Sequence, residues 1–188
     1  MFKEKIVRFL TLSIILVFCS IKLFALDLKS SVFENGGYIP DRYTCDGKNY
    51  SPPLSWDNLP KDTKSLALVV DDLDAPLGIW VHWLVYNLPT DKEGIEENIS
   101  NEKIDSLGAE QGKNDFGQTN YGGPCPPSGP VHKYSFKLYA LDKNITTKNV
   151  IDKSEFMKLI QGHIIAQTKL SGFYQRQENK KGEKNEKN

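Results

Sequence analysis

The most regular pattern of apolar and polar positions lies between residues 131 and 141. Apolar, aromatic or imidazole side chains occupy every second position there, with lysine or serine between them. This two-residue period predicts a half-buried strand over Val131–Leu141, because successive side chains of a strand point to opposite faces. The side chains expected on the buried face are His132, Tyr134, Phe136, Leu138 and Ala140, and those expected on the other face are Lys133, Ser135 and Lys137.

Two shorter apolar runs predict further strands. Ser65–Val70 favours a buried strand that stops at the acidic turn Asp71–Pro76. Three carboxylates in four residues cannot all be buried without partners, so Asp71 is expected to be solvated. Ile79–Leu88 is apolar at most positions, as in a central strand covered on both faces. The residues expected to share one face of this strand are Trp80, His82, Leu84 and Tyr86.

One helix is predicted near the end of the chain, over Asp152–Gln167. Its start resembles a capping box, Asp152–Glu155. Gly162 lies inside this segment and weakens the helix by about 1 kcal/mol relative to alanine. The apolar residues that fall at helical spacing are Phe156, Leu159, Ile160 and Ile164.

The remaining segments predict short strands and long connections. Leu26–Phe33 and Gly172–Tyr174 are candidate first and last strands. Tyr38–Trp56 is loop-like, with several Pro and Gly residues. Asp91–Gln118 is polar and predicts a long connection. The residues alone therefore predict a mostly β fold with one clear helix.

The strand that starts at Val131 follows a segment rich in glycine and proline, Tyr121–Pro130. Proline donates no backbone N–H and fixes φ, so this segment predicts a stiff, shaped loop. His132 and Tyr134 begin the buried face where the loop ends. Two polar-tipped rings at the edge of an apolar layer, under a rigid loop, are typical of a small pocket.

The two ends of the chain differ from its body. Residues 1–25 have a basic start, a short apolar run and a small residue at Ala25, which predicts a secretory signal peptide; an uncleaved membrane anchor is the alternative. Residues 175–188 are rich in Lys, Glu and Asn and predict a disordered charged tail. Residues 26–174 then form one domain. This domain carries more acidic than basic side chains, and this charge balance does not favour binding to nucleic acid.

Export would leave two cysteines, Cys45 and Cys125. An oxidising compartment makes a disulfide between them possible, and two small buried thiols are the alternative. A metal site on these cysteines is disfavoured, because no Cys-x-x-Cys spacing occurs. No cofactor is expected.

Several motifs together resemble those of the phosphatidylethanolamine-binding protein family, also called the Raf kinase inhibitor-like family, and its bacterial branch in particular. The resemblance covers roughly residues 27 to 176. The segments that carry it are Tyr43–Gly47, Ser51–Trp56, Asp71–Pro76, Trp80–Trp83, Gly123–Pro127, His132–Tyr134 and Gly172–Arg176.

The resemblance implies packed antiparallel β-sheets with a few peripheral helices and a small anion-binding pocket. Two residues depart from the family pattern: Leu73 stands where proline is usual, and Lys133 where arginine is usual. Lysine lacks the bidentate fork of arginine, so a salt bridge to the acidic turn should be weaker. The pocket residues implied by the resemblance are Asp72, Asp74, Pro76, Trp80, His82, Pro126, Pro127, His132 and Tyr134.

The chemistry of these residues suits an anion. His82, His132 and the hydroxyl of Tyr134 would supply three donors toward a phosphate or carboxylate group. Asp72 would orient an imidazole or take the ammonium of an ethanolamine head group. Protonated imidazoles would favour a dianion, so affinity is expected to rise as the pH falls toward about 6.5.

Three functions are compatible with these residues. The first is an exported binding protein for phosphate or a phospholipid head group such as phosphoethanolamine. The second is an inhibitor of a protease or kinase that acts through outer loops. The third is a hydrolase, which is disfavoured because the sequence has neither Gly-x-Ser-x-Gly nor His-Glu-x-x-His. Contact with a membrane is expected only through an uncleaved signal segment.

Overall fold

The computed structural model describes residues 25–177. The predicted signal peptide and charged tail lie outside this range, apart from Ala25 and residues 175–177. The elements of the described part are β1 (Asp27–Lys29), β2 (Gly37–Tyr38), the 3₁₀ helix η1 (Asp41–Tyr43), β3 (Leu54–Asp57), β4 (Ser65–Asp72), β5 (Trp80–Leu88), β6 (Gly94–Ile95), α1 (Asn101–Ser106), β7 (Glu110–Gln111), β8 (His132–Leu141), α2 (Lys153–Leu159) and β9 (Ile164–Tyr174).

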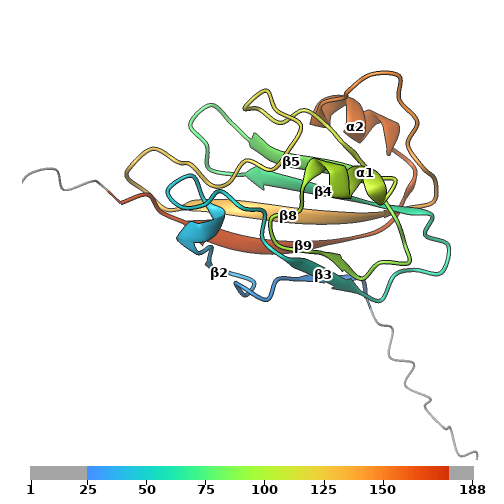
Figure 1. Cartoon of the computed structure of the whole chain (residues 1–188), viewed down its shortest axis with the longest axis horizontal. Coiled ribbons are helices and arrows are strands. Elements are labelled where there is room, and N and C mark those ends of the chain that lie inside the picture. Colours follow the sequence, from blue (N-terminus) through green and yellow to red (C-terminus); the bar gives the residue numbers. More distant parts are fainter. Residues whose placement is uncertain (1–24, 178–188) are drawn as a thin grey trace, which may run out of the picture.

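The strands form two packed sheets, which confirms the predicted mostly β fold. A six-stranded sheet has the order β2-β9-β8-β4-β5-β7, and a three-stranded sheet has the order β1-β3-β6. The long strands are antiparallel, and Figure 1 shows them side by side with β3 beneath. Leu28 and Trp56 of the small sheet join Leu68 and Phe136 of the large sheet in one buried cluster. Burying each such side chain contributes about 1.5–3 kcal/mol.

The opposite face of the large sheet is covered by α2 (Figure 1). Phe156 on this helix packs with Val69 and Leu84 in a second buried cluster. The side chain of Asp152 caps the helix by accepting from the backbone N–H of Glu155 at 2.8 Å.

The helix is shorter than predicted, because it ends at Leu159 rather than Gln167. Gly162 has a φ of 78°, a left-handed conformation that glycine adopts without strain and that turns the chain out of the helix. Ile164, expected on the apolar face of the helix, instead begins the strand β9 and is partly exposed.

The strand β4 is longer than predicted and includes both Asp71 and Asp72. The expectation that Asp71 is solvated is wrong, because its exposed fraction is 0%. Its carboxylate is compensated from two elements: Oδ2 lies 2.7 Å from Nζ of Lys153 on α2 and 3.6 Å from Nζ of Lys137 on β8. The pairing offsets the penalty of burying the charge.

The strand β5 contains an irregularity that alters which residues share a face. Val70 pairs with Trp83 but Asp71 pairs with Val81, so His82 has no partner residue on β4. His82 consequently packs against Tyr134 on the small-sheet side. Leu84 and Tyr86 lie on the other face, in the cluster under α2. The prediction that these residues share a face with Trp80 and His82 is therefore wrong beyond the bulge.

The two connections predicted from sequence contain short regular elements. β3 (Leu54–Asp57) lies within the segment predicted as loop-like, and α1 lies within the long polar connection, with Ser100 as its N-cap. Each is shorter than about two helical turns or five strand residues, so its periodicity is weak in the sequence. No helix within residues 25–177 has the length and apolar character needed to cross a membrane.

Candidate functional site

A cavity of about 280 Å³ opens at one end of the large sheet, between the turn after β4 and the loop before β8. Six of the nine residues that the sequence predicts for the site line it, whereas Asp74, His132 and Tyr134 do not. The complete lining is Asp72, Ala75, Pro76, Leu77, Trp80, His82, Phe116, Cys125, Pro126 and Pro127.

The strand ends position the polar side chains of this cavity. Asp72 is the last residue of β4 and pairs with Trp80 on one side and Tyr134 on the other. Residues paired directly across a sheet project from the same face, so Asp72 and Trp80 both line the cavity, and Tyr134 lies behind its wall. The bulge in β5 adds His82 to this face.

The imidazole of His82 has a defined orientation. Its Nδ1 lies 2.6 Å from the carbonyl oxygen of Gly122. A carbonyl oxygen only accepts, so Nδ1 carries a proton and the Nε2 of neutral His82 presents a lone pair. The rings of Phe116 and Tyr134 flank the imidazole edge-on, each with its centroid 5.2 Å away. Burial lowers the pKa of His82 below its usual value, and the Gly122 carbonyl opposes that shift in part.

The carboxylate of Asp72 uses both oxygens within the protein. Oδ2 lies 2.8 Å from Nδ1 of His132, and both side chains are almost fully buried. Oδ1 accepts from the backbone N–H of Asp74 at 2.9 Å. His132 therefore stands behind the cavity and orients Asp72, instead of lining the cavity as predicted.

Tyr134 also lies behind the cavity wall, with an exposed fraction of 0%. Its hydroxyl has no hydrogen-bond partner within residues 25–177. Burial raises the pKa of Tyr134 well above its usual value, so the hydroxyl remains protonated. A ligand oxygen that reached it would give this buried donor a partner.

The acidic turn is fastened to β8 by backbone groups. Asp74 accepts from the backbone N–H of Lys133 at 2.8 Å, and the backbone N–H of Leu73 donates to the carbonyl of Lys133 at 2.9 Å. The side chain of Lys133 forms no ion pair within the described residues. The salt bridge considered from sequence is thus replaced by two bonds to the backbone of Lys133, one from the Asp74 carboxylate and one from the Leu73 N–H, and neither depends on the choice of lysine or arginine.

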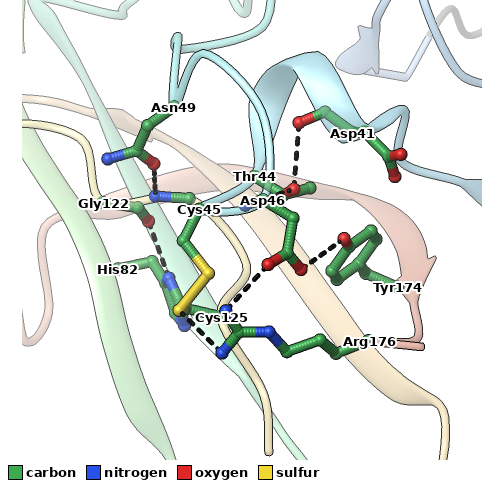
Figure 2. Close-up of a disulfide and its surroundings, with 11 residues drawn as sticks. Asp41, Thr44, Cys45, Asp46, Asn49, His82, Gly122, Cys125, Tyr174 and Arg176 are labelled. Atoms are coloured by element: carbon green, nitrogen blue, oxygen red, sulfur yellow. Dashed lines mark hydrogen bonds and ion pairs between the residues drawn. A yellow bond between two sulfur atoms is a disulfide. The ribbon is translucent and has the colours of Figure 1, made fainter. Parts of the chain in front are cut away.

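The loop of Tyr121–Pro130 is held at several points along its length. Figure 2 shows the disulfide that joins Cys45 to Cys125, over a sequence separation of 80 residues. The carbonyl of Pro124 accepts from the backbone N–H of Cys45 at 3.0 Å, and Gln175 donates to the carbonyl of Gly129 at 2.7 Å. These contacts fix the wall that carries Pro126 and Pro127.

The C-terminal end of β9 adds a polar cluster beside the disulfide (Figure 2). Asp46 accepts from the hydroxyl of Tyr174 and pairs with the guanidinium of Arg176, both at 2.8 Å. Burial is the main cause that raises the pKa of Tyr174 to about 12. Tyr174 also pairs with His132 across the sheet, so this cluster adjoins the back of the cavity.

Sequence reasoning missed Phe116, which forms one wall of the cavity and packs on Trp80 and His82. Buried Asn114 fixes the turn that carries it, because its Oδ1 accepts from the backbone N–H groups of Phe116 and Gln118 at 3.1 and 2.9 Å. The signal available in the sequence was a single aromatic residue within a long polar connection.

The described residues contain no group of three or more His, Cys, Asp or Glu side chains placed to hold a metal ion. The cavity offers a titratable imidazole, a fixed carboxylate and apolar walls. This combination suits a small polar group whose remaining surface is apolar.

Comparisons with known proteins define the class. The sequence profile of the phosphatidylethanolamine-binding protein family matches residues 29–175. The chain belongs to this family, as its motifs suggested. Family members are in general binding proteins.

Among individual relatives, a protein from Methanothermobacter thermautotrophicus named UPF0098 protein is 48% identical over 151 residues, which cover 80% of this chain and 99% of the relative. A crystal structure of a putative phosphatidylethanolamine-binding protein homologue, CT736 from Chlamydia trachomatis, has a TM-score of 0.74 at 38% identity and covers 81% of this chain and 98% of that one. Escherichia coli YbcL, described as a member of the mammalian family, has a TM-score of 0.75 at 30% identity, covering 82% and 100%.

Proposed function

We propose that this protein is an exported binding protein whose cavity holds a small anion, either phosphate or the phosphate of a phospholipid head group. The observation that carries the proposal is the orientation of His82. Its Nδ1 is committed to Gly122, and its other nitrogen is left for a ligand in a cavity of about 280 Å³.

The fixed tautomer of His82 makes anion binding depend on a proton. Neutral His82 presents a lone pair on Nε2, which repels an anionic oxygen. Nε2 and a phosphate oxygen can form a hydrogen bond when a proton lies between them, carried either by the imidazole or by the phosphate. Binding should therefore take up a proton above the pKa of free His82, and affinity should rise as the pH falls.

Export is supported by two features of the chain. The first residues have the composition of a signal peptide. The disulfide between Cys45 and Cys125 belongs to the wall of the cavity, and disulfides persist in oxidising compartments.

We propose binding without turnover. Asp72 and His132 form a buried hydrogen-bonded pair of the kind that activates nucleophiles, but no Ser, Thr or Cys side chain within the described residues is hydrogen-bonded to this imidazole. Cys125, which lines the cavity, is held in the disulfide. A phosphoester or peptide that is hydrolysed at a rate abolished by His132→Ala would contradict this part of the proposal.

An NMR titration of the imidazole signals with phosphate and with phosphoethanolamine, near pH 6.5, tests the anion site. The chain has three histidines, so the NMR signal of each imidazole can be followed separately. The His82 and His132 signals should shift together and saturate. His163, which pairs with Asp142 at the surface, should not move. If no signal moves at millimolar ligand, the anion site is refuted.

One observation favours a second candidate function, inhibition of a protease or kinase through an outer loop. Leu77, on the turn beside the cavity, is 94% exposed, and Ile79 is 57% exposed. Exposed apolar side chains on a tight turn are typical of contacts with another protein. Slowing of a purified serine protease that Leu77→Ser abolishes, and His82→Asn leaves intact, would select this function.

A further inference from the structure

A second cavity, of about 250 Å³, lies directly beside the first. The two are separated by Phe116 and Cys125, which line both of them. Phe116 is 43% exposed, so part of this shared wall is open to solvent. A ligand that has its anionic group beside His82 can therefore continue past Phe116 into the second cavity.

The second cavity is lined without any charged side chain. Its polar side chains are the carboxamides of Asn49 and Gln118. The oxygen of Asn49 accepts from the backbone N–H of Gly123 at 2.7 Å, and its nitrogen lies on the other side of the carboxamide, away from that bond (Figure 2). Within residues 25–177, that nitrogen and the whole carboxamide of Gln118 form no hydrogen bond.

The backbone that carries each of the two carboxamides is held in place. Gln118 is fixed by two bonds with Asn114: its N–H donates to Oδ1 at 2.9 Å, and its carbonyl accepts from the Asn114 N–H at 2.8 Å. Asn49 has a left-handed φ of 57°, and its N–H donates to the carbonyl of Thr44 at 3.1 Å. A binding group on a fixed backbone loses little conformational entropy when a ligand arrives.

We propose that the second cavity is part of the same site and holds the uncharged polyol portion of a phosphate ester, such as glycerol phosphate. The inference rests on the proposed anion site and names the class of its ligand. A hydroxyl group both donates and accepts, and so does a carboxamide, so the two match. The exposed ring of Phe116 offers an apolar surface to the C–H groups of the polyol.

The same chemistry disfavours an amine in the second cavity. An ammonium group that leaves water needs a carboxylate partner, and none lines this cavity. In the first cavity, both oxygens of Asp72 are already hydrogen-bonded within the protein. Glycerol phosphate is thus expected to bind more tightly than phosphoethanolamine.

Calorimetric titration at pH 6.0 with inorganic phosphate, glycerol 3-phosphate and phosphoethanolamine tests the proposal. Glycerol 3-phosphate should bind about three- to ten-fold more tightly than the other two, the gain from one or two neutral hydrogen bonds. Gln118→Ala should remove that gain and leave the affinity for inorganic phosphate unchanged. Gln167→Ala, at an exposed position of β9, is the matched control and should change neither affinity.

Two results would contradict the proposal that the second cavity holds the polyol. One is equal affinity of the original protein for phosphate and glycerol 3-phosphate. The other is a Gln118→Ala variant that binds all three ligands less tightly by one common factor. Gln118→Glu keeps the size of the side chain and adds a charge, so it should weaken glycerol 3-phosphate more than inorganic phosphate. If none of the three compounds binds the original protein, the anion site itself fails. If phosphate binds and the glycerol group adds no affinity, the anion site stands and only the proposed role of the second cavity is contradicted.

Discussion

Asp71 and Asp72 are neighbours on β4, and their carboxylates point to opposite faces of the large sheet. On the α2 side, Asp71 is fully buried, and its charge is met by two lysines from two different elements. On the cavity side, Asp72 is 3% exposed and is met by the imidazole of His132 and a backbone N–H. Two carboxylates that are adjacent in sequence are thus paired differently, one with lysine side chains and the other with an imidazole and a backbone N–H.

The comparison separates a structural polar cluster from a functional one. The Asp71 carboxylate is paired with two lysines in the interior beneath α2. The Asp72 carboxylate lines the cavity, and its pairing with the imidazole of His132 fixes its position there. Variants on the α2 side should therefore change stability without affecting binding, whereas variants on the cavity side should change binding.

The largest effect is expected on the α2 side, from Lys153→Met. The methionine keeps the apolar stem but leaves the Asp71 carboxylate buried with only Lys137, 3.6 Å away. Removing one partner of a buried ion pair destabilises a protein by about 3 kcal/mol or more. Urea unfolding should show this loss, whereas the affinity for phosphate in the folded protein should be unchanged.

Lys158→Met on the same helix is the control, because this lysine is exposed and pairs with no acid among the described residues. It should alter stability by less than about 0.5 kcal/mol. Equal effects of the two substitutions would show that the contact with Asp71 contributes nothing beyond a surface charge.

The next effect is expected from the covalent link on the cavity side, through the double variant Cys45→Ser with Cys125→Ser. Loss of a disulfide that closes a long loop destabilises a protein by about 2–4 kcal/mol. Because Cys125 lines the cavity, phosphate affinity should fall as well, in contrast to Lys153→Met. Unfolding and calorimetric titration together measure both. A stability loss with unchanged affinity would show that the backbone bonds of Pro124 and Gly129 hold the wall without the disulfide.

The strands that frame this comparison were predictable because their periodicity is long. The residues of β8 alternate in polarity from His132 to Leu138, so the placement of Phe136 and Leu138 in the core followed from the sequence. The bulge in β5 was not predictable, since an irregularity in strand pairing depends on the partner strand and leaves no local pattern. The burial of Asp71 likewise depends on its ion pair with Lys153, which lies 82 residues away along the chain and leaves no local signal.

The candidate site divides in the same way. The motifs located the cavity and six of its lining residues, because a Pro-rich loop and an acidic turn have local signatures. The motifs did not distinguish residues that line the cavity from residues that lie behind its wall. His132 and Tyr134 occupy the predicted alternating positions of β8 but lie behind the wall. Phe116 escaped notice because its role arises from a turn that buried Asn114 organises through side-chain bonds.

A third prediction isolates the ligand-facing nitrogen of His82. In His82→Asn, the carboxamide nitrogen can replace Nδ1 and keep the bond to Gly122, while Nε2 is lost. Phosphate affinity should fall about ten-fold or more, as expected for a hydrogen bond to a charged group. Stability should change little, and calorimetry and urea unfolding measure the two quantities. His163→Asn is the control, since that imidazole is at the surface. Unchanged phosphate affinity in His82→Asn would exclude this imidazole from the site.

The smallest effect expected is a pH dependence of stability that the cavity side has and the α2 side lacks. Burial lowers the pKa of His82 below the usual value for histidine, about 6.5, so the unfolded chain binds a proton more readily than the folded one. The contribution of neutral His82 is fully present above pH 6.5 and is lost as the pH falls from there toward the folded pKa. Urea unfolding of the free protein between pH 8 and 5 should show stability falling over the lower half of that range, and His82→Asn should flatten the decline.

Lys153→Met should lower the whole curve of stability against pH without changing its slope. Phosphate should offset the decline, because the protonated imidazole that destabilises the empty cavity is the form that holds the anion. A decline that is as steep in His82→Asn as in the original protein would assign it to other groups.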